Sequence, residues 1–277
     1  MDEIVRFGPG QQLVGILSGV ESATDAPVLV LPSAGVVPRA GPFRLHVELA
    51  HRLSPYGIRT FRFDVPGVGE APRIKGWGAH ESTLAALDHL AGSHGADRFI
   101  VGGVCSAADV AWNAAAADRR VSGVMLLDGL AYTGPWFRFA LVSGVLRRPV
   151  REWFAVVRRL LMRRRSHQPV LSTSDYRDWP SREDARHQFA QLVARDVHSL
   201  WVYTGGFAGV FLHPRQFAWS FGAAVRDPRV TMHYWPDCDH TFFARTHRDR
   251  LLDTVVSWLV GNFMAASATP QPLASQS

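Results

Sequence analysis

The chain has 277 residues, of which 47% are hydrophobic and 19% are charged. This ordinary globular composition excludes collagen-like and largely disordered chains, and the length suffices for one large domain or two small ones. Two cysteines are too few for a disulfide framework and lack metal-ligand spacing, so we expect two free thiols and neither a metal nor a cofactor.

The formal net charge of +6 at pH 7 is unevenly distributed. Between residues 138 and 165 there are nine arginines and a single acid, Glu152. The first ten residues carry acids where a signal peptide would carry basic residues, and no uninterrupted run of about 18 apolar residues occurs. We therefore expect a soluble, cytoplasmic protein.

The first half of the chain alternates between short apolar runs, typical of buried strands, and segments with helical periodicity. In chain order, the expected elements are a hairpin over 3–20, a strand within 26–35, a helix over 43–56, a strand and glycine-rich loop over 57–72, a helix over 78–96, a strand over 97–105, an alanine-rich helix over 106–117 and a strand over 121–129.

Residues 130–198 form a long stretch of irregular and helical character, after which regular order returns. The expected elements there are a strand over 199–206, a helix over 213–224, a strand and loop over 229–240 and an amphipathic helix over 247–264. The final residues, 266–277, are small and polar, and we expect them to be disordered.

The alternation of strands and helices after the hairpin predicts an α/β fold, with a mostly parallel sheet covered by helices on both faces. Residues 130–198 are too many for a simple loop, so we expect a helical lid inserted after the strand that ends near Asp128. The predicted core therefore comprises residues 1–129 and 199–265.

The junction between the strand at 97–105 and the following helix contains the pattern of a nucleophile elbow. Small residues, Gly103 and Ala107, lie two positions before and two after Cys105, which lets the strand and the helix pack closely. Ser106 is a rival nucleophile, but its register would place Val104 where a small residue is needed. At a helix N-terminus the pKa of the Cys105 thiol would fall, favouring the thiolate. The alternative is a buried cysteine that serves as a small apolar residue.

On this motif and the order of elements, residues 2–265 resemble the α/β-hydrolase superfamily. The elbow of that superfamily normally reads G-x-S-x-G, whereas here Cys105 replaces the serine and Ala107 the second glycine. At this site the chain is similar to dienelactone hydrolases, polyhydroxyalkanoate synthases and Dieckmann-type cyclases, which also carry cysteine. The resemblance implies the α/β-hydrolase fold and acyl chemistry at Cys105.

The resemblance also implies a histidine base late in the chain. His240 lies in the loop between the last expected strand and the final helix, where the superfamily places that base. No carboxylate follows the strand at 199–206, the usual position of the orienting acid. Asp128 closes the apolar strand after the elbow, and a buried charge is costly unless it is paired. We therefore expect Cys105, His240 and Asp128 to form a triad; the alternative for Asp128 is a turn-capping role.

A tetrahedral intermediate needs hydrogen-bond donors aimed at its oxyanion. The backbone N–H of Ser106, directly after the nucleophile, is the first expected donor. The second should come from the loop at 32–41, with Ala34 preferred and Ser33 as the second choice. Asp64, in a segment that resembles the D-x-x-G-x-G loop of the superfamily, is expected to be structural.

The arginines between 138 and 165 alternate with apolar residues at helical spacing, which indicates an amphipathic lid helix. Four aromatic residues of the lid are expected to contact an acyl chain or another apolar substrate: Trp136, Phe137, Trp153 and Phe154. The arginines either face water or bind an acidic partner, such as an anionic membrane surface, the phosphates of a coenzyme A thioester or an acidic acyl carrier protein. Nucleic acid is not expected, because no recognition motif is present.

Three functions remain open on these grounds. The first is an esterase or thioesterase that acts on an apolar acyl substrate through a Cys105 thioester. The second is an acyltransferase or thioester-consuming cyclase with the same triad, because thioesters pass readily to amines, thiols or carbon nucleophiles. The third is a catalytically idle hydrolase fold used for binding, which need not hold the Cys105 sulfur near His240.

Overall fold

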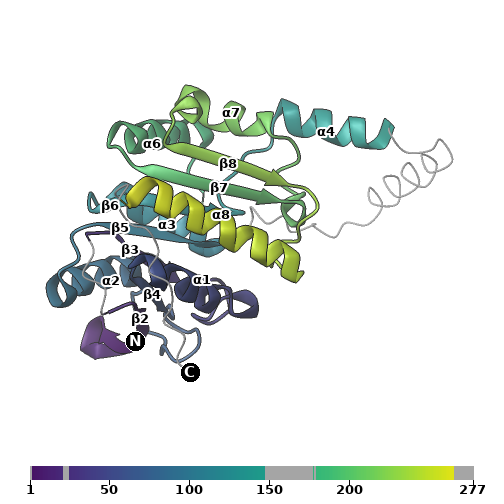
Figure 1. The fold of residues 1–277 in the computed structure, drawn as a ribbon. Helices are drawn as coiled ribbons and strands as arrows, with labels where there is room; N and C mark the ends of the chain where they lie inside the picture. The colour runs from purple at the N-terminus through teal and green to yellow at the C-terminus, as the bar shows by residue number, and fades with distance from the viewer. Residues whose placement is uncertain (1, 21–24, 147–176, 178, 265–277) are drawn as a thin grey trace.

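The computed structural model describes residues 2–20, 25–146, 177 and 179–264 (Figure 1). In these ranges the strands form one eight-stranded sheet, with the spatial order β1-β2-β4-β3-β5-β6-β7-β8. The strands are β1 (Asp2–Phe7), β2 (Leu13–Ser18), β3 (Val28–Pro32), β4 (Thr60–Phe63), β5 (Phe99–Val104), β6 (Val121–Leu127), β7 (His198–Thr204) and β8 (Val230–Trp235).

The sheet is parallel except at one edge. There β1 and β2 form the expected antiparallel hairpin, and β2 pairs antiparallel with β4. The pairs β4–β3, β3–β5, β5–β6, β6–β7 and β7–β8 are all parallel. The predicted mostly parallel sheet is therefore confirmed, and the carboxyl ends of β5 to β8 meet at one edge, where open α/β sheets bind ligands.

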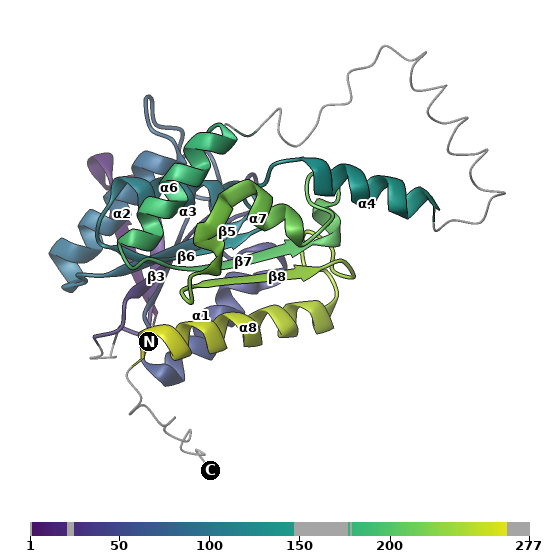
Figure 2. The same ribbon diagram turned by 90° about the horizontal axis from the view of Figure 1, so that it is seen from above.

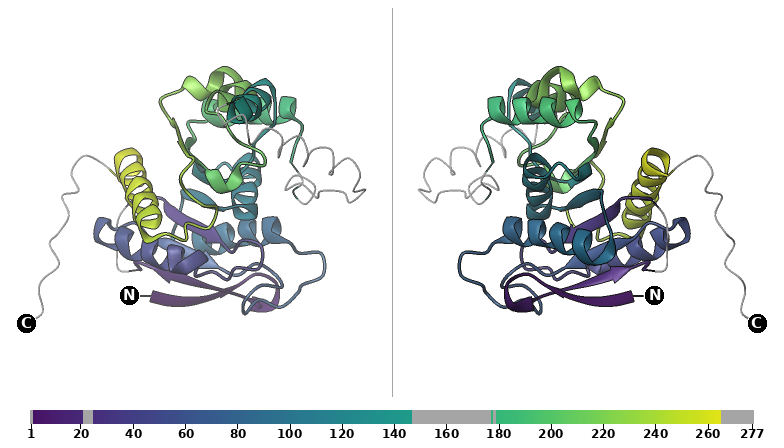
Figure 3. Two further views of the ribbon diagram at one scale, coloured as in Figure 1. Left: turned by 90° about the vertical axis from the view of Figure 1, so that its right-hand side faces the viewer. Right: turned by 90° about the vertical axis from the view of Figure 1, so that its left-hand side faces the viewer.

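Helices cover both faces of this sheet (Figures 2 and 3). One face carries α1 (Leu45–Leu53) and α8 (Arg245–Phe263), and the other carries α2 (Ala79–His94), α3 (Ser106–Ala117), α6 (Arg182–Ala194) and α7 (Arg215–Phe221). Strand β3 shows how sequence produces these layers. Val28 and Val30 join the core beneath α2 and α3, whereas Leu29 and Leu31 join the core beneath α1 and α8. An uninterrupted apolar run is thus required, because alternate side chains enter opposite cores.

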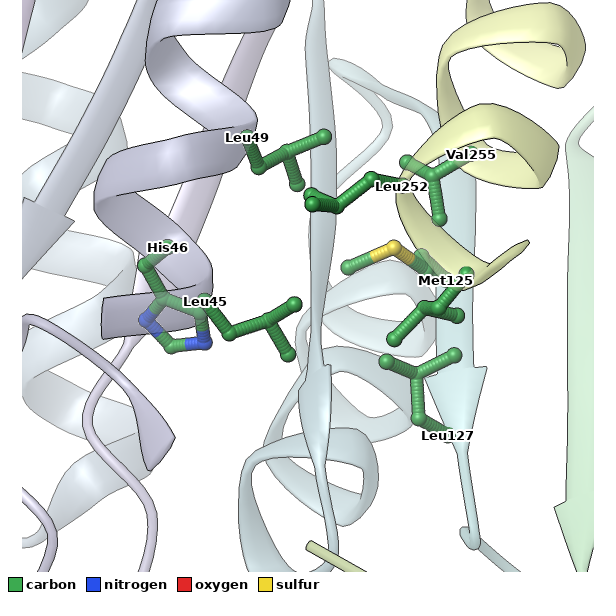
Figure 4. Close-up of a pocket in the computed structure, with 8 residues that line it drawn as sticks. Leu45, His46, Leu49, Met125, Leu127, Leu252 and Val255 are labelled. Atoms are coloured by element: carbon green, nitrogen blue, oxygen red, sulfur yellow. The ribbon is translucent and has the colours of Figure 1, made fainter. Parts of the chain in front are cut away.

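A small cavity of about 10 Å³ lies between α1, β6 and α8 (Figure 4). Apart from one histidine ring its lining is apolar: Leu45, His46, Leu49, Met125, Leu127, Leu251, Leu252 and Val255. A space of this size holds at most about one water molecule, so it is a packing defect and not a substrate site.

The range expected to form a lid, 130–198, divides into different parts. Helix α4 (Pro135–Leu146) begins beside α7 and points away from the sheet, and none of its residues is fully buried (Figures 1 and 2). Helix α6, in contrast, buries Ala185, Phe189 and Leu192 against the sheet. Assigning α6 to the lid was therefore wrong, because the parallel connection from β6 to β7 needs a crossover helix.

The rest of the expected lid, residues 147–176 and 178, lies outside the described residues, as does the expected tail at 266–277. In the part of the chain that the structure describes, no helix combines the length and the hydropathy needed to cross a membrane.

Candidate active site

Cys105 lies at the sharp turn between β5 and α3. Its backbone has φ 58° and ψ −122°, a conformation that is unfavourable for any residue with a side chain. A Cβ atom on Gly103 would lie 2.4 Å from the Cβ atom of Ala107, so strand and helix approach closely only because residue 103 is glycine. The steric pattern expected of a nucleophile elbow is therefore present with Cys105 at its centre, and Ser106 begins the helix.

Asp128 follows β6 and is fully buried at the end of the neighbouring strand. Its Oδ2 atom lies 2.7 Å from Nδ1 of His240. Thr204, the last residue of β7, donates its backbone N–H to Oδ1 at 2.7 Å and its hydroxyl to Oδ2 at 2.6 Å. These donors compensate the burial of the carboxylate and orient it toward His240.

The role of Thr204 was not predicted from the sequence, yet its position contains a clue. The end of β7 is where the superfamily usually carries the acid, and Thr204 occupies that strand end. The threonine there binds a carboxylate that comes from the adjacent strand instead.

The imidazole of His240 also interacts with the Cys105 thiol. This interaction is the main cause that lowers the pKa of the thiol; partial burial opposes it, and the charge of Arg177 and the backbone amide of Ser106 support it. The pKa of His240 is raised to about 9, first by its hydrogen bond with Asp128 and then by its interaction with Cys105. The opposite directions of the two shifts favour a thiolate–imidazolium pair.

A pair of glycines after β7 brings His240 into place. A Cβ atom on Gly206 would lie 2.2 Å from the backbone nitrogen of His240. The N–H of Gly206 donates to the carbonyl oxygen of Cys238 at 3.1 Å. The loop that carries His240 therefore packs directly against the backbone at the end of β7, which a side chain on Gly206 would prevent.

The expected oxyanion donors differ in availability. The backbone amide of Ser106 interacts with the Cys105 thiol and lowers its pKa, whereas Ala34 forms an isolated antiparallel bridge with Val37, whose N–H donates to the Ala34 carbonyl oxygen at 2.9 Å. Ser33 was a wrong second choice, because its N–H donates to the Phe63 carbonyl at 2.9 Å within the sheet. The Ser106 hydroxyl accepts the N–H of Gly35 at 3.0 Å, so it joins the elbow to the loop that contains Ala34.

Asp64 stabilises the loop at 32–41, which contains Ala34. Its buried carboxylate accepts the backbone N–H of Arg39 at 2.6 Å and that of Glu70 at 3.2 Å, and it also binds the Arg39 guanidinium. These bonds connect the loop at 32–41 with the loop after β4, in agreement with the structural role expected for Asp64.

The aromatic residues predicted to bind substrate are not brought to the triad within the described ranges. Trp136, on α4, stacks on His213 with 5.2 Å between ring centroids, and the Arg215 guanidinium lies 4.8 Å from the centroid of the Trp136 ring. These contacts attach α4 to the start of α7. Phe137 is half-buried on the same helix. The two remaining residues, Trp153 and Phe154, lie outside the described residues.

One aromatic ring that the sequence did not single out does contact the triad. Phe207 is buried and lies nearly parallel to the His240 ring, with 6.3 Å between centroids. The second cysteine, Cys238, is also buried near the site, and burial is the main cause that raises the pKa of its thiol to about 12. The two free thiols therefore differ, since conditions that favour a thiolate at Cys105 keep Cys238 protonated.

No protein-family model matches the sequence, and no curated protein sequence matches it. Solved structures are similar over nearly the whole chain. An esterase from Pyrococcus furiosus aligns with a TM-score of 0.58 at 12% identity, covering 95% of this chain and 91% of the esterase. A protein of unknown function from Agrobacterium tumefaciens, a candidate α/β-hydrolase, aligns with a TM-score of 0.58 at 14% identity, covering 94% of each chain.

A third similar structure, AbyA5, aligns with a TM-score of 0.58 at 17% identity, covering 94% of this chain and 71% of AbyA5. At identities this low, the similarity concerns the path of the backbone and not the chemistry. The order and direction of the strands, the elbow after β5 and these alignments agree on one architecture: the chain has the α/β-hydrolase fold.

Proposed function

We propose that this chain is a hydrolase-type acyl-transfer enzyme in which Cys105 forms a thioester intermediate, and that it acts as an esterase or thioesterase on an apolar acyl substrate. The main support is the hydrogen-bond chain from Thr204 through Asp128 to His240, whose imidazole in turn interacts with the Cys105 thiol and lowers its pKa. An idle fold has no need to keep this chain intact around a buried carboxylate.

In the first half of the proposed reaction, the Cys105 thiolate attacks the carbonyl carbon of the substrate. The carbonyl π electrons move to oxygen, and the amides of Ser106 and Ala34 stabilise the oxyanion. The tetrahedral intermediate then collapses, and the bond to the alcohol or thiol breaks. His240 gives its proton to this leaving group, and the acyl group stays on sulfur.

In the second half, His240 takes a proton from water as the water oxygen attacks the thioester carbon. Collapse of the second tetrahedral intermediate releases the carboxylic acid and restores the Cys105 thiolate, with the proton now on His240. Asp128 stabilises the imidazolium in both halves by accepting the Nδ1–H bond at 2.7 Å.

An apolar substrate is supported by side chains next to the catalytic loops. Val36 is 90% exposed two residues after Ala34, and Phe243 is 69% exposed three residues after His240. Phe43, which follows the loop at 32–41 and is also exposed, contacts Phe243 with 5.3 Å between ring centroids, so exposed apolar side chains from the two parts of the chain lie together. Burying such a surface against an acyl chain would favour binding.

The proposed acceptor is water, and transfer to an amine, a thiol or a carbon nucleophile is the alternative. The intermediate is compatible with this alternative, because a thioester reacts slowly with water. A time course of acyl-enzyme decay, in buffer alone and with added amine or thiol, separates hydrolysis from transfer.

The arginine-rich segment suggests an acidic partner, for which a coenzyme A thioester, an acyl carrier protein and an anionic membrane surface all stay proposals. Most of its arginines lie outside the described residues. The described part, α4, leaves Phe139, Leu141, Val142 and Leu146 exposed, so an apolar surface accompanies the positive charge.

Intact-mass spectrometry after mixing the protein with p-nitrophenyl hexanoate and with a short acyl thioester tests the proposal. We expect one acyl group on Cys105, none in Cys105→Ala, and acylation slowed by about 10²- to 10⁴-fold in His240→Ala. Ser106→Ala should still form the adduct, because the hydroxyl of Ser106 is not the nucleophile.

Labelling with iodoacetamide serves as a second measurement that does not depend on the acyl group. Rapid alkylation confined to Cys105 is expected. No acyl adduct, or equal alkylation of Cys105 and Cys238, would contradict the proposal and favour an idle fold that acts as a binding protein.

A further inference from the structure

A single arginine joins the backbone at two members of the triad. The guanidinium of Arg177 donates from Nη2 to the carbonyl oxygen of Cys105 at 2.8 Å and from Nη1 to that of Asp128 at 3.0 Å. The side chain of Arg177 is only 5% exposed. The same group therefore spans the carboxyl ends of β5 and β6, which carry the nucleophile and the acid.

Both carbonyl groups belong to residues with unusual backbones. Cys105 has φ 58° and Asp128 has φ 49°, in the left-handed region that residues with side chains rarely adopt. Such conformations cost free energy and persist only where surrounding contacts hold them. Hydrogen bonds from Arg177 to both carbonyl oxygens are contacts of this kind.

Arg177 is itself held in a fixed orientation. Asp109, one turn into α3, accepts hydrogen bonds from Nε and Nη2, the latter at 2.6 Å. Trp179 donates its indole N–H to the same carboxylate at 3.0 Å, and the Arg177 guanidinium lies 4.8 Å from the centroid of the Trp179 ring. Planar, two-pronged donation of this sort is a property of arginine that lysine lacks.

We propose that Arg177 is a positioning residue for the reaction at Cys105: its guanidinium binds the carbonyl groups of Cys105 and Asp128 together and so fixes the nucleophile relative to the acid that orients His240. The inference rests on the proposed function for its catalytic consequence, but the change in thiol reactivity that it also predicts can be measured without a substrate.

The charge of Arg177 acts in the same direction as its geometry. Three groups from three elements face the Cys105 thiol: His240 from the loop after β8, Arg177 from the segment before α6, and the backbone amide of Ser106 at the start of α3. All three lower the pKa of the thiol, and partial burial raises it. Loss of Arg177 therefore removes one of the groups that stabilise the thiolate.

The test compares Arg177→Gln and Arg177→Lys with a control at Arg182, the first residue of α6. Arg182 donates to the carbonyl oxygen of Trp219 at 3.4 Å, and its guanidinium lies 4.4 Å from the centroid of that ring, away from the triad. Arg182→Gln therefore removes a similar stacked arginine without touching the site. For each protein we would measure Tm, the pH profile of Cys105 alkylation by iodoacetamide, and the rate of acylation by p-nitrophenyl hexanoate.

For Arg177→Gln we expect the midpoint of the alkylation profile to rise by about one pH unit and acylation to slow by about 10²-fold. Arg177→Lys should restore most of the alkylation midpoint, because it keeps the charge, but should leave acylation slow, because one ammonium cannot bridge both carbonyl groups. Arg182→Gln should change neither, whatever its Tm.

An alkylation midpoint and an acylation rate in Arg177→Gln equal to those of Arg182→Gln would overturn the inference. If Arg177→Gln does not fold, Arg177→Lys decides the question, since wild-type acylation in that variant would equally overturn it. A wild-type protein that alkylates at Cys105 but never acylates would contradict the proposed function instead, while the shift in the alkylation midpoint would still test Arg177.

Discussion

At the scale of single residues, the proposed reaction depends on opposite pKa shifts at Cys105 and His240. The pKa of His240 is raised to about 9 and that of Cys105 is lowered. The ion pair therefore exists above the pKa of the thiol and below about pH 9. Acylation should follow a bell-shaped profile: it falls at low pH as the thiolate is protonated, and at high pH as His240 loses the proton that the leaving group needs.

Asp128→Asn tests this coupling. Without the carboxylate, the pKa of His240 should fall back toward its ordinary value, so the thiolate loses its cationic partner near neutral pH and the pKa of Cys105 rises. Once that pKa lies above 7, alkylation of Cys105 at pH 7 should slow by about tenfold for each further unit of rise. Asp237→Asn, in the His240 loop but 59% exposed and paired with Arg250, is the matched control. Equal alkylation profiles in the two variants would contradict the coupling.

Whether a site residue could be predicted from the sequence depends on how far apart in the chain it and its contacts lie. The steric pattern around Cys105 is local, so it could be recognised without a fold. Arg177 contacts Cys105 from 72 residues away, and Thr204 contacts Asp128 from 76 residues away. Neither residue stands in a local pattern, because only tertiary packing brings them to the site.

At the scale of elements, the position of the loop that carries His240 depends on its close contact with the backbone of Gly206 after β7. Gly206→Ala would place a Cβ atom 2.2 Å from the His240 nitrogen, and therefore must displace the loop. We expect acylation to fall by about 10²-fold, because a shift of about 1 Å at a catalytic group has that effect.

Gly209→Ala is the matched control for that change. It lies three residues along the chain, and no atom lies within 4 Å of the Cβ position there. Acylation rates, with Tm recorded for both variants, check the prediction. Normal acylation in Gly206→Ala would show that the close approach is not needed to position His240.

The elements themselves were predicted well where period and length agreed. The alanine-rich helix expected over 106–117 is α3 with the same limits. Helix α6 falls in the range 130–198, which was assigned to a lid by its length alone, and within the described chain its buried residues are Ala185, Phe189 and Leu192. That narrow apolar stripe nevertheless packs against Trp112 and Trp201 of the core, which periodicity alone cannot reveal.

At the scale of the whole molecule, the two faces of the sheet differ in chemistry. The residues of the proposed site lie at the carboxyl ends of the strands. The face of the sheet that α1 and α8 cover buries the imidazole of His46, which takes no part in the proposed reaction. His46, on α1, is 2% exposed beside the small cavity (Figure 4), and its Nδ1 lies 3.2 Å from the Arg39 carbonyl oxygen. Burial is the main cause that lowers its pKa to about 4.

The stability of the whole fold should therefore decline in acid. Below about pH 6.5 the unfolded chain protonates His46 while the folded protein does not, so unfolding takes up a proton and becomes easier. The contribution of His46 to the free energy of unfolding is fully present above about pH 6.5. It falls by about 3 kcal/mol as the pH approaches 4.

His46→Gln isolates that contribution, because its amide can donate to the Arg39 carbonyl without titrating. Urea unfolding at pH 7 and at pH 4.5 should show the wild type losing about 2 to 3 kcal/mol more than the variant over this interval. Comparing the two losses cancels any cost that glutamine imposes at both pH values. His51→Gln makes the same change at an exposed position of α1 and should lose as much as the wild type. Equal losses in all three proteins would mean that His46 is protonated in the folded state, and that the core beneath α1 tolerates a charge.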